Sequence, residues 1–144
     1  MYGVSKMAVR FGYGENYIEV TNFRFHKEEV DRGNPHNTTF SVVVHSCGFC
    51  GVAPCEYDIK EFAIFTADLH RLYDFQIDKV LLRDICYGSE ILFVIDRTGH
   101  IDVSGKIFGD CMIHTLEFCF DGDQTVLKSF LEGLDDLLGQ TANI

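Results

Sequence analysis

The chain has 144 residues, of which 22 are acidic and 12 are lysine or arginine, so its formal net charge at pH 7 is −10. Apolar residues make up 47% of the sequence and phenylalanine occurs 13 times, which excludes intrinsic disorder and supplies enough core for a single domain over residues 1–144. The acidic balance argues against direct binding to DNA or RNA, since phosphates require a basic face. The sequence has no apolar run of the roughly 18 residues that span a membrane and no signal-peptide pattern, so we expect a cytoplasmic protein without membrane contact.

The first half of the chain predicts two strands. Residues 17–25 alternate, but the parity of their apolar positions changes half-way, so a β-bulge near residues 21–22 is needed to keep these side chains on one face. The charged segment 26–39, which contains glycine and proline, predicts a loop. Residues 40–46 are rich in β-branched side chains and predict a second strand. We expect the glycines and the proline within residues 48–54 to end it.

The next segment has two interpretations. Residues 57–65 either form a strand that leads into a helix capped by Thr66, or Asp58 and Glu61 form a capping box that starts the helix earlier. The apolar stripe that follows is helical in both cases. We favour the start at Thr66, which predicts a helix over about 66–76.

A meander of strands occupies the second half. The predicted strands are 80–86, 91–95, 101–107 and 112–121, and short turns between them imply antiparallel pairing. In the last strand one parity is the expected core face, with Met112, His114, Leu116, Phe118 and Phe120.

A turn at Asp121, Gly122 and Asp123 then leads into the final helix. Leucine and phenylalanine recur at three- and four-residue steps over residues 124–138, which predicts a helix lying on a sheet. Asp123 or Thr125 can cap its start, and we expect it to end at Gly139. The sequence thus predicts an α+β fold: a twisted antiparallel β-sheet (meander) with two amphipathic helices, about 66–76 and 124–138, packed on one face.

The six cysteines raise the question of a metal site. Cys47, Cys50 and Cys55, with His45 nearby, resemble half of a zinc site, but a structural site requires four ligands and no second pair follows. We therefore expect no metal and no cofactor, and keep Cys47, Cys50 and Cys55 as the alternative metal site of a zinc- or thiol-dependent module. The remaining cysteines stand singly on predicted strands and are expected to be small buried hydrophobes: Cys86, Cys111 and Cys119.

No catalytic pattern is present in the sequence. It lacks a glycine-rich phosphate loop, a nucleophile elbow, a His-Glu-x-x-His zinc motif and a calcium loop. His100 opens a predicted strand beside a turn, and His114 lies on an apolar parity, so both are predicted to be structural. We expect no catalytic residue, and a protein that is not an enzyme.

Several landmarks of the chain occur in a distinctive order. In sequence they are the helix opening Thr66-Ala-Asp68-Leu69, its end Leu72-Tyr73, Gly99-His100-Ile101-x-Val103-x-Gly105-x-Ile107, Leu116-x-Phe118-x-Phe120, and Asp123-Gln124-Thr125-x-Leu127. With the meander between them, this order resembles the WapI-type immunity protein family over residues 57–138, and more loosely over 17–25. The chain departs from that family in the segments 26–39 and 47–55.

The resemblance implies a bacterial cytoplasmic protein that neutralises the toxin domain of a cell-wall-associated polymorphic toxin. The inhibitor would bind this cognate toxin stoichiometrically and occlude its active site, and an acidic inhibitor suits a toxin with a basic groove. A protein-binding scaffold without a toxin partner is the other alternative, and the sequence predicts no oligomeric state. The exposed acids expected at the partner interface are Glu28, Glu29, Asp31, Asp102, Glu117 and Asp121.

Overall fold

Two four-stranded antiparallel sheets form most of the molecule. The computed structural model describes residues 9–141. The first sheet has the order β1 (Val9–Tyr13), β2 (Asn16–Phe25), β3 (Thr38–Ser46) and β4 (Phe49–Tyr57). The second has the order β5 (Lys79–Arg83), β6 (Glu90–Ile95), β7 (His100–Phe108) and β8 (Thr115–Asp123). The predicted α+β class and antiparallel meander are confirmed, and the structure adds a division of the strands into two sheets.

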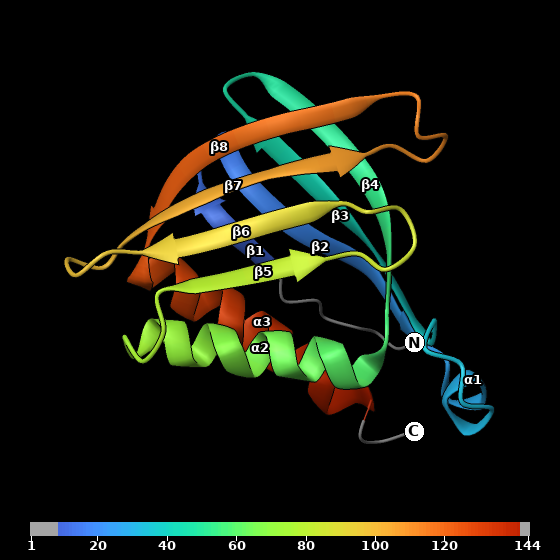
Figure 1. The fold of residues 1–144 in the computed structure, drawn as a ribbon. Coiled ribbons are helices and arrows are strands. Elements are labelled where there is room, and N and C mark those ends of the chain that lie inside the picture. Colours follow the sequence, from blue (N-terminus) through green and yellow to red (C-terminus); the bar gives the residue numbers. More distant parts are fainter. Residues whose placement is uncertain (1–8, 142–144) are drawn as a thin grey trace, which may run out of the picture.

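Three helices complete the described chain: α1 (Lys27–Asp31), α2 (Ile59–Tyr73) and α3 (Gln124–Thr141). The two long helices contact each other, and Figure 1 shows them side by side beneath the crossing strands of the sheets. Helix α2, which follows the first sheet, contacts β5 of the second sheet, whereas α3, which follows the second sheet, contacts β1 of the first. Each long helix therefore packs against the first strand of the other half of the chain.

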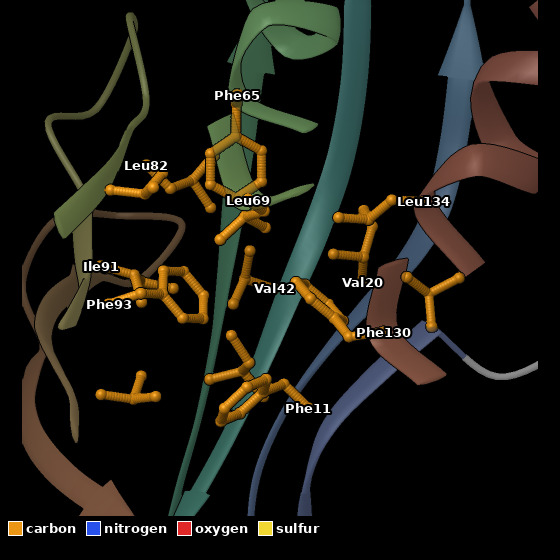
Figure 2. Packing of buried hydrophobic residues seen from close by; sticks show 14 of the residues in the cluster. Phe11, Val20, Val42, Phe65, Leu69, Leu82, Ile91, Phe93, Phe130 and Leu134 are labelled. Carbon is orange, nitrogen blue, oxygen red and sulfur yellow. The ribbon is translucent and has the colours of Figure 1, made fainter. Parts of the chain in front are cut away.

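The core lies between the sheets and the long helices. Its buried residues form one cluster to which both sheets and both long helices contribute. Phe11 of β1 is fully buried, and its ring centroid lies 5.5 Å from that of Phe93 on β6 and 6.0 Å from that of Phe130 on α3. Figure 2 shows these rings together at the centre of the packing. The two halves thus share a single core.

Helix α2 begins earlier than predicted. The predicted start at Thr66 is wrong, and the alternative start at Asp58 is correct. Asp58 has an extended backbone, and its side chain accepts a hydrogen bond from the Lys60 amide at 3.0 Å. Thr66 is buried inside the helix, where its hydroxyl donates to the Phe62 carbonyl at 3.0 Å. The cap therefore lies where β4 ends, and the helix runs from Ile59 to Tyr73 instead of over 66–76.

The bulge in β2 is confirmed, and the predicted loop after it is partly wrong. The pairing of β2 with β3 shifts register between Thr21 and Arg24, and Asn22 has a φ of +54° within this step. The segment 26–39 contains helix α1 as well as the first residues of β3. None of the residues of α1 is buried, so this short helix has no apolar stripe from which it could be predicted.

The strand predicted over 40–46 ends at Ser46 as expected, but Gly51 and Pro54 do not interrupt the sheet, because they lie within the next strand, β4. Cys47 and Gly48, with φ of +51° and +88°, form a two-residue hairpin turn, and β4 follows at once. Pro54 is tolerated because β4 is an edge strand. A side chain at Gly51 would place its Cβ 3.1 Å from a Leu116 methyl group, so glycine at this position lets β4 approach β8.

The junction of β8 and α3 contains no turn, in contrast to the prediction. Strand β8 continues to Asp123, and α3 begins at Gln124 and passes Gly139 to end at Thr141. Gly122 is required for packing, since a Cβ there would come within 2.5 Å of the Phe11 ring. At the other end β8 starts only at Thr115, so Met112 and His114 are exposed, whereas Phe118 and Phe120 are buried as predicted.

Candidate partner-binding surface

The outer face of the second sheet is open to solvent. Along each strand its side chains alternate with the buried ones, and the register arranges them in rows across the sheet. The rows are Lys79, Val94, Asp102 and Asp121; Leu81, Leu92, Ser104 and Cys119; and Arg83, Glu90, Lys106 and Glu117. All of these side chains are exposed or half-buried. In Figure 1 this sheet stands in front of the other, with α2 and α3 below it. We call this surface the outer face of β5–β8.

Two carboxylates and an imidazole gather at one end of the outer face of β5–β8. Asp102 and Asp121 are direct cross-strand partners on β7 and β8, and His100 lies two residues before Asp102. The His100 Nε2 atom is 3.0 Å from Asp102 Oδ1 and 3.6 Å from Asp121 Oδ1. Like charges directly opposite on neighbouring strands repel each other, and the imidazole reduces this repulsion when it is protonated. We call these three residues the acidic end.

The pKa of His100 is raised above its usual value of 6.5. The largest cause is the hydrogen bond that the imidazole donates to Asp102, and the charges of Asp102, Asp121 and Asp96 act in the same direction. Partial desolvation opposes them. The acidic end therefore holds a proton more firmly near neutral pH than a free histidine would.

The turn before β7 is fixed by Asp96. Its Oδ1 atom accepts hydrogen bonds from the Thr98 amide at 2.8 Å, the Thr98 hydroxyl at 2.6 Å and the His100 amide at 3.1 Å. These bonds lower the pKa of Asp96, with the Thr98 hydroxyl as the largest cause. Because the His100 backbone is bonded to Asp96 and its ring to Asp102, the position of the imidazole is defined from two sides.

Asp123, the cross-strand partner of His100, connects the acidic end to the first sheet. Its carboxylate accepts a hydrogen bond from the Tyr13 hydroxyl, at 3.0 and 3.1 Å to the two oxygens, and another from the Val126 amide at 3.0 Å. The second bond caps α3, as the sequence predicts. Desolvation and, after it, the Asp123 carboxylate raise the pKa of Tyr13.

Apolar side chains occupy the middle of the outer face of β5–β8. Leu81 is 44% exposed. Together with Leu92, Ser104 and Glu117 it lines a hollow in this face. An apolar centre flanked by charged residues is the usual anatomy of a protein–protein interface, where the charged rim gives specificity.

The structure separates the six acids predicted at the partner interface into two groups. Asp102, Asp121 and Glu117 share the outer face of β5–β8. Glu28, Glu29 and Asp31 lie on α1, which Figure 1 places at the opposite side of the molecule from the start of β7. Within that second group the Glu29 carboxylate is 3.5 Å from the Arg32 guanidinium. A single partner-binding surface that includes the acidic end therefore does not include α1.

The alternative metal site at Cys47, Cys50 and Cys55 is not assembled. Cys50 and Cys55 lie on opposite faces of β4, because an odd spacing along a strand reverses the side-chain direction. Cys55 is buried, whereas Cys47 and Cys50 are exposed. A shared metal ion would require these thiols to converge on one point.

The other three cysteines contradict the prediction of burial. Cys86, Cys111 and Cys119 are all exposed. Cys86 and Cys111 lie in turns instead of on strands, and Cys119 has the outward parity of β8. The buried cysteine of the described chain is Cys55, which faces the core from β4.

The acidic end is also the place where the described residues offer potential metal ligands. One ligand atom from each of His100, Asp102 and Asp121 lies within 4.8 Å of the others. One nitrogen and two oxygen donors are compatible with several divalent cations. The three side chains are exposed and already interact with one another.

His100, Asp96 and Tyr13 were missed as members of the candidate surface. The alternation His100-x-Asp102 on a predicted strand is the signal that places two of the side chains on one face. The contributions of Asp121 and Tyr13 depend on strand register and on contact between the sheets, which a single sequence does not specify.

In residues 9–141 no helix combines the length and apolar character needed to cross a membrane.

Comparisons with known proteins add little to this picture. No protein-family model matches the chain, and no curated protein matches it. Among solved structures it is similar to Trypanosoma bruciei MRP1/MRP2, with 12% sequence identity and a TM-score of 0.43 over 83% of each chain. A likeness at this level carries no argument about function.

Proposed function

We propose that this chain is an immunity-type protein, which binds a cognate bacterial toxin domain in the cytoplasm and neutralises it by stoichiometric occlusion. The observation that carries the proposal is the outer face of β5–β8, an open sheet surface with an apolar centre and the acidic end at one side. The landmarks between Gly99 and Leu127, which resemble the WapI-type family, include the strands that carry the acidic end. The proposal assigns no catalytic residue and no cofactor.

The charge of the chain supports a basic partner. A net charge of −10 attracts a positively charged surface over a distance and raises the rate of association. The ladder between β7 and β8 places Asp102 and Asp121 opposite each other, so a cation of the partner meets two neighbouring carboxylates on one face. Toxins that act on nucleic acid require basic grooves, and an inhibitor seated in such a groove would exclude the substrate.

The gene of an immunity protein is expected to lie beside that of its toxin, so co-expression with a toxin domain encoded there tests the proposal directly. We expect the wild-type protein to restore growth, and the double variant Asp102→Lys/Asp121→Lys to lose this protection. The matched control is Glu28→Lys/Glu29→Lys, which changes the net charge equally but lies on α1. Both double variants are compared with the wild type by circular dichroism, so that loss of protection is separated from loss of fold.

Binding measurements in solution with the same variants give the contribution of Asp102 and Asp121 to toxin affinity. Close charge pairs that stabilise a complex have coupling energies of about 1.5–7 kcal/mol, so we expect Asp102→Lys/Asp121→Lys to weaken toxin binding at least about tenfold. The association rate of the wild type should fall as salt rises, because exposed charges are screened. Retained protection in Asp102→Lys/Asp121→Lys, or equal loss in the α1 control, would remove the outer face of β5–β8 from the interface. Failure of the wild type to bind or neutralise the toxin would refute the proposed function and leave a protein-binding scaffold as the remaining alternative.

A further inference from the structure

The outer face of the first sheet carries a row of interacting side chains that partner binding does not use. The strand register places Tyr17 on β2, His45 on β3 and Cys50 on β4 side by side. The Cys50 Sγ atom is 3.2 Å from the His45 Nε2 atom, within hydrogen-bond distance. A thiol and an imidazole nitrogen in contact are a nucleophile with a base that can take its proton.

The imidazole of His45 is oriented by its other neighbour. The Tyr17 ring stacks on it with centroids 4.6 Å apart and planes 19° from parallel. On the far side of Tyr17, the guanidinium carbon of Arg10 lies 3.8 Å from the centre of the phenol ring. Each of the four strands thus supplies one member of the series Arg10, Tyr17, His45 and Cys50. A base that is itself oriented by a third group is typical of an activated nucleophile and is absent from a thiol that is only exposed.

The hairpin between β3 and β4 produces the thiol–imidazole contact. Cys47 and Gly48 form the two-residue turn, so His45 and Cys50 become direct cross-strand partners. The Asn16 side chain accepts a hydrogen bond from the Cys47 amide at 2.8 Å and attaches the turn to β2. The relevant pair is therefore His45 with Cys50, rather than Cys47 with Cys50.

We propose that Cys50 is a modification site, at which its thiol exchanges with small-molecule disulfides of the glutathione type. His45 takes the thiol proton, and the Cys50 thiolate attacks one sulfur of the disulfide. The new S–S bond joins Cys50 to one half of the small molecule while the original S–S bond breaks. The other half leaves as a thiolate and receives the proton from the His45 imidazolium. One disulfide and one thiol are consumed and one of each is formed, so no further oxidant is required.

The other cysteines lack this environment. Cys55 is buried, and desolvation together with the Asp84 charge raises the pKa of its thiol. Desolvation and then the Glu56 carboxylate raise the pKa of Cys86. Cys47, Cys111 and Cys119 are exposed, and among the residues that the structure describes the thiol–imidazole hydrogen bond is that of Cys50. The chain therefore contains its own reference thiols.

Competitive alkylation of the folded chain tests the proposal. We expect iodoacetamide at a limiting concentration to label Cys50 about tenfold faster than Cys111 or Cys119, as read by peptide mass mapping, since a positioned base typically contributes 10²–10⁴-fold. His45→Asn should abolish the difference, whereas His114→Asn, on an exposed turn, should preserve it. Tyr17→Leu, which keeps the base and removes the stacked ring, should reduce it part-way.

Reaction with glutathione disulfide tests the product. We expect one glutathione per chain, located on Cys50 and absent in Cys50→Ser, with reversal by dithiothreitol. Equal labelling of Cys50 and Cys111, full labelling rates in His45→Asn, or glutathione on another cysteine would each overturn the proposal. Circular dichroism of each variant keeps a folding defect distinct from a loss of reactivity. Neither experiment involves the toxin, so the outcome is independent of the proposed function.

Discussion

The two halves of the chain have the same architecture and different outer surfaces. Each half consists of four antiparallel strands in chain order, followed by a long helix. Each long helix is capped by an aspartate, Asp58 for α2 and Asp123 for α3. Both sheets turn apolar side chains toward the common core. On the outside, the first sheet carries the series that ends in His45 and Cys50, whereas the second carries the acidic end.

This contrast shows which part of the sequence specifies the fold and which part is left for function. Inward positions of both halves meet the same requirement, which is to fill a close-packed interior. Outward positions carry no such requirement, so the two sheets differ there without any cost to the core. We therefore look for function on the outer faces, and the predictions below either separate the two halves or show that they act as one.

The largest effect is expected where the two halves meet. Phe11→Ala removes a fully buried ring that packs on Phe93 and Phe130, and should reduce the free energy of unfolding by about 3–5 kcal/mol. Phe49, which is 69% exposed, is the matched control, and Phe49→Ala should have little effect. Urea unfolding followed by circular dichroism measures both. Because the core is shared, we expect one transition; two separate transitions would show that the halves unfold independently.

The two helix caps compare the halves at equivalent positions. Asp58→Ala and Asp123→Ala should each reduce the free energy of unfolding by about 1 kcal/mol. Asp123→Ala should have the larger effect, since the bond from the Tyr13 hydroxyl that it also removes is shorter, at 3.0 and 3.1 Å, than the 3.4 Å bond from the Asn37 side chain to Asp58. Asp136→Ala, which removes an exposed carboxylate bonded to Gln140, is the control. A larger loss from Asp58→Ala would contradict the role of Asp123 as a link between the sheets.

The smallest effect concerns His100 and appears as a dependence on pH. Because the pKa of His100 is higher in the folded chain than its ordinary value of 6.5, its contribution to stability is fully present below that value. It is lost as the pH rises through the raised pKa. The difference in urea midpoint between wild type and His100→Gln should therefore be largest under mildly acidic conditions and shrink toward higher pH. His114→Gln is the control, and a difference that grows with pH would contradict the assignment.

The strands were predictable because their pattern is local. The alternation of Phe118 and Phe120, the irregularity near residues 21–22 and the strand starts around residues 91 and 101 all follow from side-chain periodicity. Glycine is harder to interpret, because both a tight turn and a close packing contact select it. Gly122 was predicted in a turn, whereas its position near the Phe11 ring demands a residue without a side chain. Such a contact between distant segments leaves no local signal.

The candidate surfaces were predictable only in part, for the same reason. Asp102 and Asp121 were named individually, but their pairing depends on the register of β7 with β8. In the sequence His45 and Cys50 stand beside two other thiols, and the hairpin turn decides which pair is in contact. The prediction of buried cysteines in the second half failed for two reasons: Cys86 and Cys111 lie in turns, and Cys119 has the outward parity of β8.

Each long helix packs on the other half of the chain, and this arrangement also determines the order in which the molecule can fold. Helix α3 covers β1, and at Gly133 the approach is so close that a Cβ would lie 3.0 Å from a Val9 methyl group. During synthesis more than half of the chain follows β1 before the helix that covers it is made. Until then the apolar side chains of β1 stay exposed. Closing such a distant contact is the slow step that topology predicts. A ribosome-bound chain that stops before α3 should therefore be a ready substrate for chaperones, whereas the finished chain should not.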